Sequence, residues 1–334
     1  MNLSPLVSII IPTFNSANNI FSTIESVLNQ DYSNFEIIIV DDFSSDGTEK
    51  IIFDHFKNES RIIYRKLPKN SGPAVARNTA ISISSGELIA FLDSDDEWLP
   101  RKLKIQVELL SQFPNIDLLF TEVENFNHLT GEVTFYSKTN KIFTRGLSLI
   151  PVRNCESLYK LEGNIKNELY TGNFICISSV IVKKKFLNDI NYFDSGRFGT
   201  EDLDLWIRLA DKCNFFYLHK KLVRYNWMEN SISRINIKRL NELINFHKTA
   251  LNKPEYSSLL DIAYKNLYFT YKLLIIEYSK KWDPIMAWKI YAESRNYPIK
   301  KGLIYFAILS FFGHLPIFIK LKLINPISGL IRNE

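Results

Sequence analysis

The sequence has few cysteines, and none stands in a metal-binding or disulfide pattern. The 334 residues contain three, Cys155, Cys176 and Cys213, without a C-x-x-C pair or a Cys/His cluster. An odd, scattered set argues against a disulfide framework and favours a reducing compartment. The amino terminus also lacks the basic stretch of a signal peptide. We therefore predict a cytoplasmic protein.

Two glycine-rich nucleotide motifs are missing. No G-x-G-x-x-G follows the first predicted strand, which disfavours a dinucleotide-binding Rossmann domain. No G-x-x-x-x-G-K-[ST] occurs, which excludes the P-loop NTPases. Residues 12–19 contain neither glycine nor lysine, and this argues against a nucleotidyltransferase with a glycine-rich, basic loop after strand one.

Long apolar runs are also lacking. Residues 303–312 are mostly apolar, but Gly313, His314 and Pro316 interrupt the segment before the about 20 residues of a membrane-spanning helix are reached. Residues 251–334 hold 12 Lys or Arg against 6 Asp or Glu, whereas the rest of the chain holds 29 against 30. This basic, apolar tail predicts an interfacial helix pair on an anionic membrane rather than a nucleic-acid partner. A helical cap on the rest of the protein is the alternative.

Strands and helices alternate up to about residue 125. Short β-branched runs predict buried strands, and apolar residues at helical spacing follow them. This alternation predicts an α/β fold with a parallel sheet and helices on both faces, in which ligands bind beyond the carboxyl ends of the strands. The predicted strands are Val7–Ile11, Glu36–Val40, Ile62–Lys66, Leu88–Leu92 and Leu118–Thr121. Beyond them, residues 125–175 combine polar, Asn-rich loops with short apolar pieces, which suggests an acceptor-side insertion. Cys176–Val182 is predicted to be a strand, Glu201–Lys212 a helix, and the chain from about 235 mostly helical.

Polar clusters follow three of these strands, at Pro12–Asn15, Asp41–Asp42 and Asp93–Asp96. Because carboxyl ends of parallel strands share an edge, we expect the clusters to converge. The carboxylates of Asp93–Asp96 repel one another unless solvent or a cation intervenes, and hard divalent cations prefer carboxylate and phosphate oxygens. We predict Mg²⁺ or Mn²⁺ bridging a diphosphate here. An acidic turn capping a helix that begins near Trp98 is the alternative.

The remaining candidate groups each have a structural alternative. Asp41 and Asp42 suit hydrogen bonds from a base or ribose, or from their own turn. Ser71 is predicted to cap a helix whose second turn carries Arg77, a candidate phosphate ligand or a surface arginine. Glu201-Asp202 follows the candidate cap Thr200 and would complement the helix dipole, or else supply a general base.

Taken in order, several segments resemble the family 2 glycosyltransferases with a GT-A fold. They span about residues 7–210: VSIIIPTFN (7–15), SVLNQ (26–30), EIIIVDD (36–42), GPAVARN (72–78), FLDSDDEW (91–98) and TEDLDLW (200–206). The resemblance implies a mixed sheet flanked by helices. It implies inverting transfer of a sugar from a nucleotide-diphosphate sugar, here a UDP-sugar, to a hydroxyl of a saccharide or lipid-linked acceptor in surface polysaccharide synthesis, at the cytoplasmic face of the membrane.

The resemblance also assigns roles. Asp202 is implied as the catalytic base, with Glu201 beside it. Asp93 and Asp95 are implied as ligands of Mn²⁺ or Mg²⁺, which stabilises the departing nucleoside diphosphate. The implied donor-binding residues are Pro12, Thr13, Asn15, Asp41, Asp42, Arg77, Asp93 and Ser94. Residues 1–235 form the implied catalytic domain, with a nucleotide half to about 125 and an acceptor half at 126–235, and 236–334 the helical C-terminal region.

The sequence departs from the family pattern at two places. Phe14 stands where relatives often have Tyr, and Asn226 and Met228 stand where many have Arg-x-His. Contacts of that pair to metal or phosphate would then be missing, or would be supplied by Arg224, Arg234 or His219. The alternative function is a sugar-nucleotide-binding scaffold without turnover. Asp95 and Asp202 argue against it, and the departures favour it.

Overall fold

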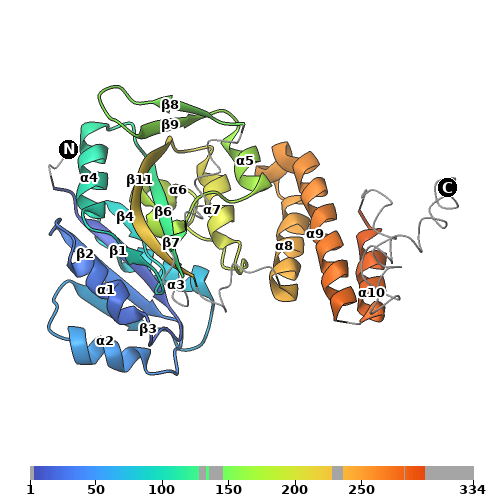
Figure 1. Ribbon diagram of the computed structural model, residues 1–334, viewed down its shortest axis with the longest axis horizontal. Helices are drawn as coiled ribbons and strands as arrows, with labels where there is room; N and C mark the ends of the chain where they lie inside the picture. The colour runs from blue at the N-terminus through green and yellow to red at the C-terminus, as the bar shows by residue number, and fades with distance from the viewer. Residues whose placement is uncertain (1–3, 128–132, 135–145, 228–235, 282, 298–334) are drawn as a thin grey trace, which may run out of the picture. The chain divides into compact units, whose positions relative to one another are not determined.

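The chain divides into two compact units, Met1–Ser231 and Ile232–Glu334. The computed structural model describes residues 4–127, 133–134, 146–227, 236–281 and 283–297 (Figure 1). The predicted interfacial segment at 303–319, together with Met228 and Arg234, lies outside the described residues.

The first unit is built on one mixed sheet of 11 strands (Figure 1). Its order is β3-β2-β1-β4-β10-β6-β11-β9-β8, with β5 paired to β11 and β7 to β6. The strands are β1 (Val7–Thr13), β2 (Phe35–Asp41), β3 (Ile62–Lys66), β4 (Leu88–Phe91), β5 (Glu97–Trp98), β6 (Leu118–Asn127), β7 (Val133–Thr134), β8 (Ser148–Pro151), β9 (Leu158–Glu162), β10 (Ile181–Lys183) and β11 (Phe215–Trp227).

Strand direction decides where the polar loops lie. β1 is parallel to β2 and β4, and β2 to β3. β10 is antiparallel to both β4 and β6, and β11 is parallel to β6. The carboxyl ends of β1, β2, β3, β4, β6 and β11 therefore point to one side of the sheet, here called the carboxyl edge. The α/β mixed sheet flanked by helices is confirmed.

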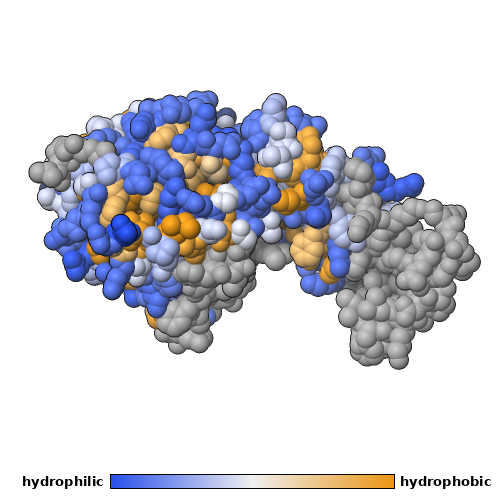
Figure 2. Space-filling model, turned by 90° about the horizontal axis from the view of Figure 1, so that it is seen from above, coloured by the Kyte–Doolittle hydropathy of each residue, from blue (hydrophilic) through white to orange (hydrophobic). Residues whose placement is uncertain are grey.

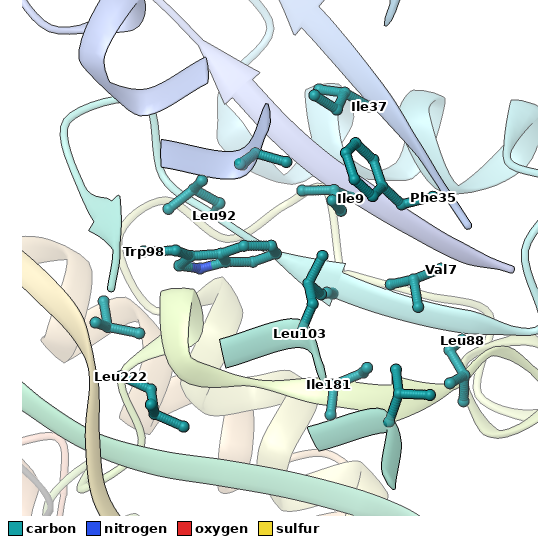
Figure 3. Close-up of a cluster of buried hydrophobic side chains, with 14 of the residues drawn as sticks. Val7, Ile9, Phe35, Ile37, Leu88, Leu92, Trp98, Leu103, Ile181 and Leu222 are labelled. Atoms are coloured by element: carbon teal, nitrogen blue, oxygen red, sulfur yellow. The ribbon is translucent and has the colours of Figure 1, made fainter. Parts of the chain in front are cut away.

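Helices cover both faces of the sheet. The β-branched residues of the central strands alternate between the two faces, as the period of two requires. Figure 3 shows Ile9 and Ile37 on one face, packed with Trp98 and Leu103. On the other face Phe91 lies edge-on to Trp206, at 6.3 Å between ring centroids. The helices among the described residues of this unit are α1 (Ile20–Leu28), α2 (Thr48–Phe56), α3 (Pro73–Ile83), α4 (Lys102–Gln112), α5 (Ile165–Thr171), η2 (Ile177–Ser179), α6 (Lys184–Asp189) and α7 (Glu201–Leu209).

Within residues 125–175, where the sequence shows loops and short apolar pieces, the structure contains β7, β8, β9 and α5. Two local predictions are wrong. Cys176–Val182 is not one strand, because the 3₁₀ turn η2 precedes β10, and the Ser179 hydroxyl bonds back to the Cys176 carbonyl. Ser71 does not cap α3, because Gly72 occupies the N-cap position and makes no side-chain cap.

The second unit is helical, as predicted. It contains α8 (Ile237–Ala250), η3 (Pro254–Leu259), α9 (Leu260–Lys280) and α10 (Pro284–Ser294), packed around an apolar core that includes Leu240, Leu267 and Leu274. Apolar side chains also reach the surface of this unit (Figure 2). Phe269 and Ile285 are exposed apolar residues of α9 and α10. None of the described helices combines the length and apolar character needed to cross a membrane.

Candidate active site

Arg77 joins two of the predicted site motifs at the carboxyl edge. From α3, its Nη2 lies 2.7 Å from Asp93 Oδ1 and its Nη1 lies 2.9 Å from Glu201 Oε1. Arg77 is 4% exposed and Glu201 6%. Side chains 124 residues apart in sequence thus form a buried bridge between the acidic loop after β4 and the start of α7.

Burial and charge act against each other in this bridge. Burial alone would lower the pKa of Arg77, but the carboxylates of Asp93 and Glu201 raise it above its ordinary value. Burial raises the pKa of Glu201, Arg77 lowers it, and the charge of Asp202 raises it again, with an upward result. Arg77 is therefore charged at all relevant pH values and is the counter-ion of both carboxylates.

The acidic loop Asp93–Asp96 is held by hydroxyl groups. Ser178 of η2 donates to Asp96 Oδ2 at 2.5 Å and accepts from the Asp93 amide at 3.1 Å. The Thr23 hydroxyl of α1 donates to the carbonyls of Ser94 and Asp96. The Ser94 hydroxyl lies 2.7 Å from that of Ser16. The loop is thereby fixed in place while Asp93 and Asp95 keep partly exposed side chains.

The electrostatics of this loop fit a cation. Burial and the charge of Asp93 raise the pKa of Asp95 to about 6. Burial and its two acidic neighbours raise the pKa of Asp96 as well. No three acidic, histidine or cysteine side chains converge as a complete metal site within the described part of the chain. A divalent ion that takes one or two carboxylates and fills its shell with phosphate oxygens and water fits these residues.

Asp41 and Asp42 at the end of β2 organise neighbouring loops. Asp41 is fully buried and accepts from the Ser44 amide and the Tyr64 hydroxyl. Asp42 accepts from the amides of Ser71 and Gly72 at 2.6 and 2.7 Å. Gly72 has φ 89° and ψ 162°, a backbone region that only glycine adopts without strain. Asp42 thus fixes the two residues that precede α3, without capping the helix itself.

Predicted donor-binding residues of β1 lie beside these aspartates. Pro12 and Thr13 are buried and pair in register with Val40 and Asp41. Asn15 accepts from the Ser45 amide through its side chain, which ties the loops after β1 and β2 together. Two aromatic side chains of these loops are exposed, Phe14 at 48% and Phe43 at 51%.

Asp202 stands in the first turn of α7, next to the buried Glu201. Asn173 Nδ2 donates to Asp202 Oδ2 at 2.7 Å, and the Leu203 amide donates to Oδ1. Thr200 is the N-cap residue, but its hydroxyl makes no cap hydrogen bond. The carboxylate is therefore oriented by Asn173 from outside the helix and by the Leu203 amide from within it.

The end of β11 completes the edge. Arg224 Nε donates to Glu124 at 3.0 Å, and its Nη1 lies 3.8 Å from Glu97. His219 lies earlier in the strand, 5.8 Å from Tyr217 between ring centroids. Asn226 contacts the acidic loop directly. Sequence reasoning missed Ser178, Asn173 and Thr23, which have no local pattern and act only through long-range contacts.

Known proteins match the chain over most of this unit. A model of the family described as Glycosyl transferase family 2 matches residues 8–166. The chain is 31% identical over 241 residues to an uncharacterized glycosyltransferase of Methanocaldococcus jannaschii, covering 71% of this chain and 76% of that protein. It is 34% identical over 209 residues to the Escherichia coli UDP-Glc:alpha-D-GlcNAc-diphosphoundecaprenol beta-1,3-glucosyltransferase WfaP, covering 62% of this chain and 71% of that protein.

A solved structure has the same fold. The crystal structure of Staphylococcus aureus TarS 1-349 in complex with UDP gives a TM-score of 0.56 at 18% identity, covering 87% of this chain and 88% of that chain. The chain spans only 44% and 50% of the length of two other curated relatives. The matched segments contain the acidic loop after β4 and the aspartates after β2. On these matches, the chain belongs to glycosyl transferase family 2.

Proposed function

We propose that this protein transfers a sugar from a UDP-sugar to a hydroxyl of a lipid-linked saccharide, with inversion at the anomeric carbon. The Arg77 bridge carries the proposal. A donor site needs a cation-binding loop, and single displacement needs a base opposite the leaving group. Arg77 ties the acidic loop to the first turn of α7, so the candidate cation loop lies beside the turn that carries the candidate base Asp202.

Each side chain then has one task. Asp95, with Asp93, would hold Mn²⁺ or Mg²⁺, which neutralises charge on the departing diphosphate. Asp202, oriented by Asn173, takes the proton of the acceptor hydroxyl as the oxygen of that hydroxyl bonds to the anomeric carbon. Glu201, fixed by Arg77, shapes the acceptor side next to that base.

The nucleoside end of the donor is assigned to the loops after β1 and β2. Pro12, Thr13 and Asn15 would line it, and the buried Asp41 and Asp42 keep its walls in position. Ser94 would lie near the diphosphate. Arg77 would sit near the diphosphate and hold Asp93 and Glu201 in place, because its Nη atoms bond both carboxylates.

Unpaired buried polar atoms at this edge support the assignment. Thr13 Oγ1, Arg77 Nε, Glu201 Oε2 and Asn226 Oδ1 are buried and have no hydrogen-bond partner among the described residues. Buried polar groups in native proteins are nearly always satisfied. Four such atoms from β1, α3, α7 and β11 are consistent with a polar ligand that completes their bonding.

The acceptor class comes from the relatives. WfaP is named for a GlcNAc-diphosphoundecaprenol acceptor, and the TarS structure is named for UDP. A lipid-linked acceptor places the enzyme at the cytoplasmic face of a membrane. The basic, apolar residues of the tail would hold it there.

The test is transfer from a panel of UDP-sugars with Mn²⁺ to a lipid-linked saccharide, read as released UDP. Asp202→Asn should abolish transfer while donor binding survives, because only the base is lost. The matched control is Asp54→Asn on the exposed surface of α2, which should leave transfer unchanged. Equal loss of binding and turnover in Asp202→Asn contradicts the base assignment. Donor binding without turnover in the wild type favours the scaffold alternative.

A further inference from the structure

Asn226, close to the end of β11, is bonded to the same acidic loop as Ser178. It is 3% exposed. Its Nδ2 donates to the Asp95 carbonyl at 2.8 Å and to Glu97 Oε1 at 3.3 Å. Its backbone amide donates to Asp96 Oδ1 at 3.4 Å. Three consecutive acidic residues are thus bonded by one asparagine, which pairs in register with Phe126 of β6.

The orientation of the Asn226 amide follows from these partners. Both groups that face Nδ2 are acceptors, so exchanging the amide oxygen and nitrogen would set oxygen against oxygen. Oδ1 therefore points away from them. It is buried and has no donor among the described residues. A buried carbonyl oxygen without a partner is unfavourable, so it marks a place where something else binds.

Only a few kinds of group can bind Asn226 Oδ1. Oδ1 is an acceptor and takes a cation, a cation-bound water or a hydroxyl. The phosphate oxygens of a donor carry no hydrogen to give it. Side-chain amide oxygens are common ligands of hard divalent cations. Arg224, two residues earlier, already bonds Glu124 and is not the missing donor.

We propose that Asn226 belongs to the cation site of the acidic loop, where its Nδ2 positions Asp95 and its Oδ1 is a neutral oxygen ligand to the divalent ion, direct or through one of the ion's waters. The inference deepens the proposed function and rests on its cation. It gives a role to a residue that stands where relatives often carry arginine. Two carboxylates and one amide oxygen leave the rest of the shell to diphosphate and water.

The test is Mn²⁺ binding to the full-length protein, read from the electron paramagnetic resonance signal of free Mn²⁺, alone and with UDP. Asn226→Ala should weaken Mn²⁺ affinity by about tenfold or more, the range for loss of groups that support a metal site. Asn226→Asp loses the hydrogen bonds of Nδ2 but keeps an oxygen, so it should bind Mn²⁺ at least threefold more tightly than Asn226→Ala. The matched control is Asn214→Ala, which removes an Nδ2 bond to Asp117 at the other end of β11. It should leave Mn²⁺ affinity unchanged.

Each result is decisive for one part of the argument. If wild-type protein binds Mn²⁺ and Asn226→Ala binds it equally well, the inference is wrong and the proposed function stands. If Asn226→Asp is as weak as Asn226→Ala while thermal melts show both folded, the oxygen is no ligand and the inference is overturned. If wild-type protein binds no Mn²⁺ with or without UDP, the cation of the proposed function fails and the inference fails with it.

Discussion

Removing the Arg77 guanidinium should produce a large loss of stability. Arg77→Met leaves the buried Glu201 and the partly exposed Asp93 without their counter-ion. Breaking a buried ion pair by deleting one partner costs about 3–5 kcal/mol, because a desolvated charge stays behind. Typical domains have only about 5–15 kcal/mol of unfolding free energy, so the variant should be close to its limit. Urea unfolding at pH 7.5 measures the change.

A double-mutant cycle isolates the bridge itself. Glu201→Gln removes the charge that Arg77 compensates, so Arg77→Met should be less destabilising in that background by about 2 kcal/mol. The surface pair Lys66–Glu49 is the matched control, since Lys66→Met removes an exposed contact and should leave stability nearly unchanged. A loss below 1 kcal/mol for Arg77→Met, or strict additivity with Glu201→Gln, would refute the claim that burial makes this bridge strong.

Three further outcomes are expected. Phe43→Gly should raise the free energy of unfolding by about 0.5–1 kcal/mol. Phe43 has φ 71°, and this left-handed region costs a non-glycine residue about 1–2 kcal/mol, but glycine also gives the unfolded chain more freedom, which cancels part of the gain. An unchanged or lower urea midpoint contradicts this. Burial lowers the pKa of Lys102 in the folded protein. The free energy of unfolding of the wild type should therefore rise with pH from the folded pKa to the unfolded value of about 10.4, and Lys102→Met should lose that rise. Equal slopes of unfolding free energy against pH in the two proteins between about pH 8 and 10 would show the lysine to be solvated. Asn173→Ala should lower kcat by about tenfold with the donor KM unchanged, because a hydrogen bond to a charged group contributes about 1.5–3 kcal/mol; a change confined to KM would remove Asn173 from the orientation of Asp202.

The sequence predicts the nucleotide half of the fold well because its strands are short, β-branched and followed by amphipathic helices. The same pattern does not predict β11. Its 13 residues carry Lys220 and Lys221 in the middle, where the register with β6 shifts, so the alternation of period two is broken. The site shows the same limit, since Asp93–Asp96 is visible as a local cluster whereas its supports Ser178 and Asn226 are visible only in the folded chain.

Arg77 shows why a residue can be identified and its contacts still missed. Its place after a helix start predicts an anion ligand, and an anion is what it binds. The anions are two side chains of the protein, one of them 124 residues away. No pattern of neighbouring residues encodes a partner at that distance. Asp42 is similar, because its carboxylate binds the two amides before α3 from another strand end.

The place of β10 in the sheet bears on how this chain emerges from the ribosome. β10 comes from residues 181–183 yet lies between β4 and β6. A nascent chain that ends before β10 leaves the facing edges of β4 and β6 with unpaired amides and carbonyls in the middle of the sheet. Such edges can pair with strands of other chains. Autonomous folding of the first 166 residues is therefore unfavourable, and a chaperone that shields β4 and β6 until β10 and β11 are synthesised would be of direct use.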